Sequence, residues 1–209
     1  MSTENIQGTA GYGAQAQALA TQYESVTFED VHRDVLHLFP KTAGTVLDIG
    51  AGSGRDAAEL ARRGHRVTAV EPTAELRAEG QRLHADAAIA WRDDHLPDLA
   101  HTLASGQRHD LILLTAVWMH LDAQERDTAM RAIAALLAEG GRVVMSLRHG
   151  PVPEGRRMFD VSAHETIALA AAHGLTVCHH GEREDMLGRE GVSWSFLAFD
   201  AAAAQASRQ

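Results

Sequence analysis

The sequence predicts an α/β protein with a mostly parallel sheet of seven strands that ends in an antiparallel pair. Three observations predict this fold class. Short apolar runs alternate with helical patterns along most of the chain. A turn with three glycines follows the first run, and a helical pattern begins directly after it. No helical pattern fits between the last two runs, so these are expected to pair as antiparallel neighbours at the sheet edge.

The apolar runs expected to form strands are residues 45–49, 66–70, 87–91, 110–115, 142–147, 175–179 and 192–199. The early runs are continuously apolar, as strands are when helices cover both faces of a parallel sheet. Because helical patterns separate consecutive runs, the crossovers between parallel strands are expected to be right-handed.

Residues typical of helix ends separate these runs. Gly64 can close a helix over 55–63, because glycine readily adopts the left-handed conformation found there. Thr73 can cap a helix that ends near Gly80.

Two later helices begin with capping-box patterns. Asp122 with Glu125 predicts the start of one helix, which is expected to run to Glu139. Ser162 with Glu165 predicts the start of the other.

A single domain is expected, because 209 residues suffice for one core without disulfide bonds. Residues 1–44 are predicted to form a helical N-terminal cap, with helices over 10–23 and 28–39. Residues 45–200 are predicted to be the core and 201–209 a flexible tail.

The composition favours a cytoplasmic protein. No run of about 18 apolar residues exists that could span a membrane. The polar start of the chain, residues 1–7, lacks the pattern of a secretory signal. A single cysteine, Cys178, suits a reducing compartment and is expected to be a buried strand residue.

Charge argues against nucleic acid as a partner. The 28 acidic and 19 basic residues give a net charge of −9, which repels phosphate backbones. The 13 histidines invite a metal site, but they are scattered and form no His-Glu-x-x-His motif. The adjacent His179 and His180 would point to opposite faces of a strand. No metal is therefore expected.

The most informative motif is VLDIGAGSG at residues 46–54, where Asp48 precedes three closely spaced glycines. Glycines at this spacing let the backbone turn tightly and approach a ligand. The turn lies at the carboxyl end of the first strand, the usual ligand position in open α/β sheets. The dinucleotide fingerprint Gly-x-Gly-x-x-Gly requires a third glycine at the position of Arg55, so this motif is one residue shorter.

This combination resembles motif I of the class I S-adenosylmethionine-dependent methyltransferases, and the similarity extends from about residue 45 to residue 200. The resemblance implies a Rossmann-like seven-stranded methyltransferase sheet. It also implies S-adenosyl-L-methionine as cofactor and S-adenosyl-L-homocysteine as product. The expected cofactor-binding residues are Asp48, Gly50, Ala51, Gly52, Gly54, Arg55, Glu71, Pro72, Asp93, Asp94, Thr115 and Tyr12.

The resemblance assigns roles to several of these residues. Glu71, followed by Pro72 after the second strand, matches the acid that accepts hydrogen bonds from both ribose hydroxyls. Asp93, with Asp94 as alternate, matches the acid that binds the adenine amino group. Thr115 begins the segment expected beneath the methyl end of the cofactor.

Residues after the fourth and fifth strands are the candidates for the methyl acceptor. His120 and His149 could act as general bases, and each could instead be structural. Arg148 could bind a carboxylate through two hydrogen bonds, or form a surface ion pair. Trp118 could flank the acceptor, with core packing as the alternative.

The segments around these candidates suggest a lid and an anionic acceptor. Tyr12 and Tyr23 lie in the expected N-terminal cap, and related enzymes use such a cap as a lid. Arg156 and Arg157 belong to a loop that could border the pocket, although solvated charge explains them as well. Trp91 could line the adenine pocket or fill the core.

The leading interpretation is a methyltransferase that acts on an O, N or S atom of a small molecule, with an anionic acceptor suggested by the basic loop. A protein or nucleic-acid methyltransferase is the alternative enzyme. Amino-methylating DNA enzymes carry Asp/Asn-Pro-Pro-Tyr/Phe after the fourth strand, where this chain has TAVW at 115–118. A non-catalytic S-adenosylmethionine-binding regulatory protein is the other alternative, and the oligomeric state is not predicted.

Overall fold

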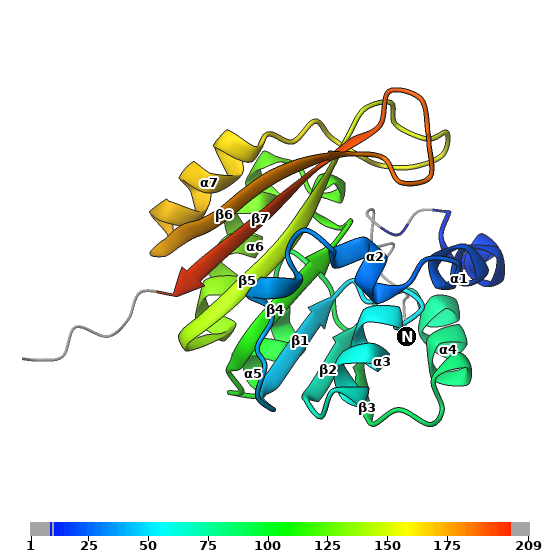
Figure 1. Cartoon of the computed structure of the whole chain (residues 1–209), viewed down its shortest axis with the longest axis horizontal. Coiled ribbons are helices and arrows are strands. Elements are labelled where there is room, and N and C mark those ends of the chain that lie inside the picture. The colour runs from blue at the N-terminus through cyan, green and yellow to red at the C-terminus, as the bar shows by residue number, and fades with distance from the viewer. Residues whose placement is uncertain (1–8, 10, 202–209) are drawn as a thin grey trace, which may run out of the picture.

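A computed structural model describes residue 9 and residues 11–201. The described residues form a seven-stranded sheet in the order β3-β2-β1-β4-β5-β7-β6 (Figure 1). The strands are β1 (Thr45–Ile49), β2 (Arg66–Val70), β3 (Ile89–Arg92), β4 (His109–Thr115), β5 (Leu137–His149), β6 (Leu175–Glu184) and β7 (Ser193–Ala201). β3, β2, β1, β4 and β5 run parallel, whereas β7 is antiparallel to both β5 and β6. The predicted fold class is confirmed.

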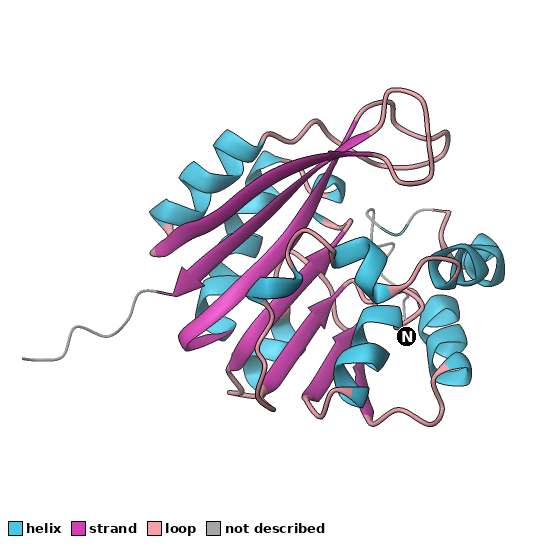
Figure 2. Cartoon of the chain, in the orientation of Figure 1, coloured by secondary structure: helices cyan, strands magenta, loops and turns pink. Residues whose placement is uncertain are grey.

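Helices cover both faces of this sheet (Figure 2). The helices are α1 (Ala16–Glu24), α2 (Phe28–His32), α3 (Arg55–Arg62), α4 (Ala74–Leu83), α5 (Ala100–Ala104), α6 (Ala123–Leu136) and α7 (Ala163–Ala172), with 3-10 turns η2 (Gly13–Gln15), η3 (Leu36–Leu38) and η4 (Trp118–His120). One apolar core joins α6 and α7 to one sheet face. A second core joins α2, η3 and α3 to the other face.

Alternation along the strands sends side chains to both cores. In β1, Leu47 and Ile49 belong to the core under α6, while Val46 belongs to the core under α3. All three side chains are buried, which explains why apolar residues occupy both faces of this strand and the buried Asp48 is the one charged residue in it.

The predicted single helix over 28–39 is wrong, because the chain breaks between α2 and η3. A straight helix would separate residues 28 and 39 by about 16 Å along its axis. The rings of Phe28 and Phe39 instead lie 5.2 Å apart, centroid to centroid. Packing both rings, together with Val35, against one small area of the sheet requires the chain to fold back.

Other differences concern element ends. The helix that begins at the confirmed capping box of Asp122 and Glu125 ends at Leu136 and not at Glu139. Its next residue, Leu137, already pairs with His109 of β4, so the strand begins early.

The C-terminal edge of the sheet also departs from expectation. β6 continues to Glu184, and its residues alternate between exposed and half-buried because it is the edge strand. Cys178 lies in this strand as predicted, but its predicted burial is wrong, since its side chain is exposed. Ala201 belongs to β7, whereas the rest of the predicted tail, 202–209, and the polar start, 1–8, lie outside the described residues.

No helix in the described part of the chain combines the length and apolar character that crossing a membrane requires.

Candidate functional site

A cavity of about 580 Å³ opens at the carboxyl ends of the strands, beneath the N-terminal segment. Its β1–β2 end is lined by the glycine turn 50–53 with Asp48, Glu71 and Pro72. Its β5–β7 end is lined by His120, by arginines and by the loop that precedes β7. Residues from α1 and from the segment before it, Tyr12 among them, line both ends.

The glycine turn has a backbone that other residues would not adopt without strain. Gly50 has a φ of +71°, and a Cβ atom built on it would lie 2.5 Å from a methyl carbon of Val117. Its absence lets the loop after β4 approach the loop after β1. Gly54 begins α3 and lies against the ring of Trp91, which packs beneath α3 and α4.

Glu71 organises the turn from the end of β2. Its side chain is buried and accepts hydrogen bonds from the backbone N–H groups of Gly52, at 2.9 Å, and Thr73, at 2.8 Å. Burial raises the pKa of Glu71 despite these two hydrogen bonds. Each carboxylate oxygen accepts one backbone hydrogen bond and keeps a second lone pair for a ligand.

Asp48 is a buried carboxylate of the β1–β2 end with an unsatisfied oxygen. It is 2% exposed, and its Oδ2 has no hydrogen-bond partner among the described residues. Burial and the negative charge of Asp56 raise the pKa of Asp48 well above its usual value. A cationic or hydrogen-donating ligand group would relieve this cost.

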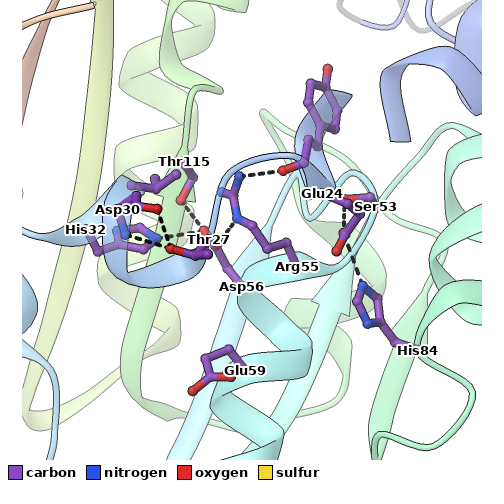
Figure 3. A network of polar contacts seen from close by, with 12 residues as sticks. Glu24, Thr27, Asp30, His32, Ser53, Arg55, Asp56, Glu59, His84 and Thr115 are labelled. Carbon is purple, nitrogen blue, oxygen red and sulfur yellow. Dashed lines mark hydrogen bonds and ion pairs between the residues drawn. The ribbon is translucent and has the colours of Figure 1, made fainter. Parts of the chain in front are cut away.

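A buried polar network behind the turn was not predicted from the sequence (Figure 3). Asp56 Oδ2 accepts from His32 Nε2 and from Thr115 Oγ1, both at 2.8 Å, and Asp56 Oδ1 accepts from Arg55 Nε at 2.7 Å. Burial opposes ionisation of Asp56, but His32 and Arg55 outweigh it and hold its pKa far below the usual value. The network ties α2 to the start of α3 and to the end of β4.

A second part of this network holds α1 over the turn (Figure 3). Glu24 Oε1 accepts from Ser53 Oγ at 2.7 Å and lies 3.1 Å from His84 Nε2. Arg55 donates to the backbone oxygen of Tyr23 at 3.1 Å. The N-terminal segment is thus fastened to the β1–β2 end by buried and half-buried polar contacts.

The acids expected near the adenine lie outside the cavity lining. Asp93 is exposed and pairs with Arg77 at 2.9 Å. Asp94 is buried and accepts two hydrogen bonds at 2.7 Å from Thr102, near the start of α5. The cavity is lined at this position by His95 and Leu96 instead.

The β5–β7 end carries a histidine in a defined orientation. His120 Nδ1 lies 2.8 Å from the backbone oxygen of Arg157, and Nε2 lies 3.1 Å from the Tyr12 hydroxyl. Burial, together with nearby arginines, lowers the pKa of His120. This lowering favours the neutral form of the His120 ring near pH 7.

Arginines give this end its charge. Arg148, Arg156, Arg183 and Arg189 all line it. Arg183 pairs with Asp34 and Arg189 pairs with Asp185, whereas no described carboxylate pairs with Arg148. Burial, followed by repulsion from Arg189, lowers the pKa of Arg148.

The other candidates for the acceptor lie away from the main cavity. His149 Nε2 is 2.7 Å from Ser195 Oγ, and the ring lines a separate cavity of about 130 Å³. The Arg157 guanidinium turns outward to Glu125 and Asp122. Trp118 is fully buried in the core under α6.

Comparison with known proteins decides the family. Residues 23–180 match a family model described as a methyltransferase domain, and this range includes the glycine turn, β1 to β5 and the start of β6. The chain belongs to the class I S-adenosylmethionine-dependent methyltransferases.

Two relatives illustrate how far the similarity goes. This methyltransferase is 29% identical over 138 residues to an uncharacterized methyltransferase of Bacillus cytotoxicus, and 28% identical over 138 residues to one of Bacillus mycoides. Each alignment covers 65% of this chain and 61% of the relative. The chain thus matches less than two thirds of the length of these curated relatives.

Solved structures share the fold across nearly the whole chain. The methyltransferase is similar to the 1,6-didemethyltoxoflavin-N1-methyltransferase of Burkholderia thailandensis, with a TM-score of 0.65 and 22% identity over 92% of this chain and 91% of that one. It is also similar to a TehB-like S-adenosylmethionine-dependent methyltransferase of Corynebacterium glutamicum, with a TM-score of 0.66 and 19% identity. That match covers 90% of this chain and 99% of the other.

The β1–β2 end of this methyltransferase fits the chemistry of S-adenosylmethionine, the methyl donor of its family. The donor presents a ribose diol, an ammonium group and a sulfonium charge. The lone pairs of Glu71 suit hydroxyl donors, and the unpartnered Oδ2 of Asp48 suits a cationic group. The bare Gly50–Gly52 backbone provides the necessary space.

The sequence offered weak signals for the residues that were missed. His32 lies in a segment where a lone histidine has many explanations, and Asp56 is one of many acids in a first helical turn. Thr115 and Arg55 were singled out, but their hydrogen bonds to Asp56 were not predicted, and the contact of His32 with Asp56 depends on the packing of α2.

Proposed function

We propose that this chain transfers a methyl group from S-adenosylmethionine to an O, N or S atom of a small, anionic molecule. One observation carries the proposal: a single cavity joins an end rich in buried carboxylates to an end rich in arginine, with a neutral histidine at the second. The volume of about 580 Å³ lies within the usual range for small-molecule sites.

In this proposal the donor occupies the β1–β2 end. Glu71 accepts from the ribose hydroxyls, Asp48 faces the cationic part, and Gly50, Ala51 and Gly52 approach the donor closely. Their support is the pair of backbone-anchored oxygens on Glu71 and the unpartnered oxygen on Asp48. Pro72, Arg55 and Thr115 complete the wall of this end.

The acceptor occupies the β5–β7 end. Arg148 binds its anionic group, since a half-buried guanidinium in the cavity wall without a described carboxylate partner favours an anionic ligand. His120 is the general base, because its ring is neutral and lies in the cavity wall. The bound donor supplies an activated methyl group, and the chain contributes position and proton removal.

Calorimetry tests the donor assignment. The purified protein should bind S-adenosylmethionine and S-adenosylhomocysteine at micromolar concentrations and should not bind NAD. Binding of NAD in place of either sulfur compound would overturn the proposal.

A turnover screen tests the acceptor class. Production of S-adenosylhomocysteine is measured with small carboxylates, phenols, amines and thiols, each offered with and without an anionic substituent. Faster turnover of the anionic member of each pair supports the proposal. Methylation of polypeptides or nucleic acid alone would favour the alternative enzymes, and donor binding without any turnover would favour a regulatory protein.

A further inference from the structure

Tyr12 lies at the β5–β7 end, although its position near the N-terminus predicted a lid over the cofactor. Its hydroxyl is 3.1 Å from His120 Nε2, and the two rings meet edge to face with centroids 5.7 Å apart. The guanidinium carbon of Arg156 lies 3.7 Å from the centroid of the Tyr12 ring. Both Tyr12 and His120 line the cavity.

The hydrogen bonds of His120 determine which nitrogen carries its proton. A backbone oxygen accepts and cannot donate, so the contact of Nδ1 with the Arg157 oxygen places the proton on Nδ1. In the neutral ring, Nε2 then has a lone pair. The Tyr12 hydroxyl must therefore donate to Nε2, which leaves the Tyr12 oxygen free to accept from another group.

The charges around the pair favour this arrangement. Burial lowers the pKa of His120, the charges of Arg156, Arg157 and Arg148 act in the same direction, and the hydrogen bond to the Arg157 backbone oxygen opposes them. Burial raises the pKa of Tyr12, and Glu71 adds to this, while Arg156 and Arg148 oppose it. Arg156 over the ring would also stabilise negative charge that develops on the Tyr12 oxygen.

We propose that Tyr12 and His120 form a proton relay for the methyl acceptor, an inference that rests on the proposed function. The acceptor gives its proton to the Tyr12 oxygen while Tyr12 passes its own hydroxyl proton to His120 Nε2. The acceptor atom keeps the electron pair of the broken bond to hydrogen and uses it to bond the methyl group. The electron pair of the broken sulfur–carbon bond stays on sulfur.

The relay serves acceptors that must lose a proton before or during methyl transfer. A phenol, an alcohol or an ammonium group must lose a proton to react, whereas a thiolate is already ionised. Tyr12 is then a catalytic residue that contacts the acceptor, and His120 takes up the proton through it. The relay also requires the N-terminal segment to be in place, since Tyr12 belongs to that segment.

Nitrogen NMR on histidine-labelled protein, without donor or acceptor, tests the pair directly. Wild type should show His120 protonated on Nδ1, with its signals assigned by their loss in His120→Asn. Tyr12→Phe removes the hydrogen bond that stabilises the neutral ring, so the His120 titration midpoint should rise by about 0.4–1 pH unit. Tyr23→Phe, the matched control on the same segment, should leave the His120 signals unchanged. An Nε2-protonated ring in wild type, or an unchanged midpoint in Tyr12→Phe, would overturn the relay.

Turnover of phenol and thiophenol probes tests proton transfer itself. Tyr12→Phe should slow phenols by about 100-fold or more, as loss of an acid–base group does, and change thiophenolates less than about 3-fold. Equal slowing of both classes would contradict the relay. Calorimetry separates the two proposals. Loss of donor affinity in Tyr12→Phe would overturn the relay and return Tyr12 to the donor site. Absence of donor binding in wild type would overturn the proposed function, and with it any role of the relay in methyl transfer, whatever NMR shows of the Tyr12–His120 hydrogen bond.

Discussion

The two ends of the cavity differ in their charged side chains, with most of the acids at one and most of the arginines at the other, although one N-terminal segment covers both. At the β1–β2 end, Asp48, Asp56 and Glu71 are all buried. At the β5–β7 end, Arg148 and Arg156 line the wall. The acids are held by contacts with the backbone, with α2 and α3 and with Thr115 of β4, whereas the arginines come from the ends of β5 and β6 and from the loops that follow them.

The two ends also differ in how the sequence determines them. The β1–β2 end depends on one short motif and on the acid that ends the next parallel strand, Glu71. The β5–β7 end depends on contacts between residues more than 100 positions apart, such as Tyr12 and His120. A site built from a short motif can stay the same in related proteins. A site built from long-range contacts between loops can differ among them, because loops vary more than the elements they connect.

The largest expected effect comes from Asp56→Ala. Removing this carboxylate leaves His32 and Arg55 buried without their partner, so the free energy of unfolding should fall by about 3–5 kcal/mol. Denaturant unfolding at pH 7 measures it, with the exposed pair of Asp127 as control, where Asp127→Ala should cost less than about 1 kcal/mol. Because the folded pKa of Asp56 is depressed, wild type should lose this stability as the pH falls below about 4. Equal losses of unfolding free energy in the two variants would show that the buried Asp56 network stabilises the fold no more than an exposed ion pair does.

Next in size is Arg148→Gln, which probes the β5–β7 end. A charge-assisted hydrogen bond contributes about 1.5–3 kcal/mol, so kcat/KM for a phenol that carries a carboxylate should fall about 10- to 100-fold. The matching amide should be almost unaffected, and donor affinity should stay constant. Arg66→Gln, at the amino end of β2, is the matched control. If the carboxylate and its amide lose activity alike, Arg148 does not recognise charge.

Glu71→Ala should weaken S-adenosylmethionine binding by about 1–3 kcal/mol, measured by calorimetry. The reason is the loss of carboxylate oxygens that are anchored by the backbone N–H groups of Gly52 and Thr73. Glu79→Ala on α4, whose carboxylate pairs with Arg82, provides the control. Unchanged donor affinity in Glu71→Ala would take Glu71 out of the binding site.

The smallest expected effect has the opposite sign. Since burial raises the pKa of Asp48, its protonated carboxyl group supports the fold below about pH 4, and this support is lost as the group ionises when the pH rises through the folded pKa. Asp48→Asn should therefore raise the melting temperature of the ligand-free protein at pH 7 and lose this advantage below about pH 4. Calorimetric melting at both pH values measures it, and donor affinity should fall in the same variant. A lower melting temperature at pH 7 would show that ionised Asp48 is stabilised by its surroundings.

The sheet was predictable because its strands are locally encoded. β1 and β2 coincide with their predicted ranges, since each is a short, mostly apolar run with a turn after it. The β6 strand was predicted too short, because an edge strand exposes polar residues that weaken the apolar signal. The break after α2 was missed because it depends on how Phe28, Val35 and Phe39 pack on the sheet.

The same reasoning explains what the sequence revealed of the site. Asp48 and Glu71 line the cavity as their strand-end positions suggested. Asp93 and Asp94 follow β3 as expected, yet Asp93 pairs with Arg77 and Asp94 accepts hydrogen bonds from Thr102 of α5, and neither lines the cavity. The Tyr12–His120 contact has no signature in the sequence, because it depends on the path of the N-terminal segment.

The position of β7 has a consequence for how the protein is made. β7 is the last strand along the described chain, yet it lies inside the sheet between β5 and β6. During synthesis, β5 and β6 have no partner on that side until residues 193–201 leave the ribosome. At about 5–20 residues per second, apolar strand edges stay open for seconds after β5 emerges. Aggregation is thus a competitor of folding mainly in this interval, before the final strand inserts.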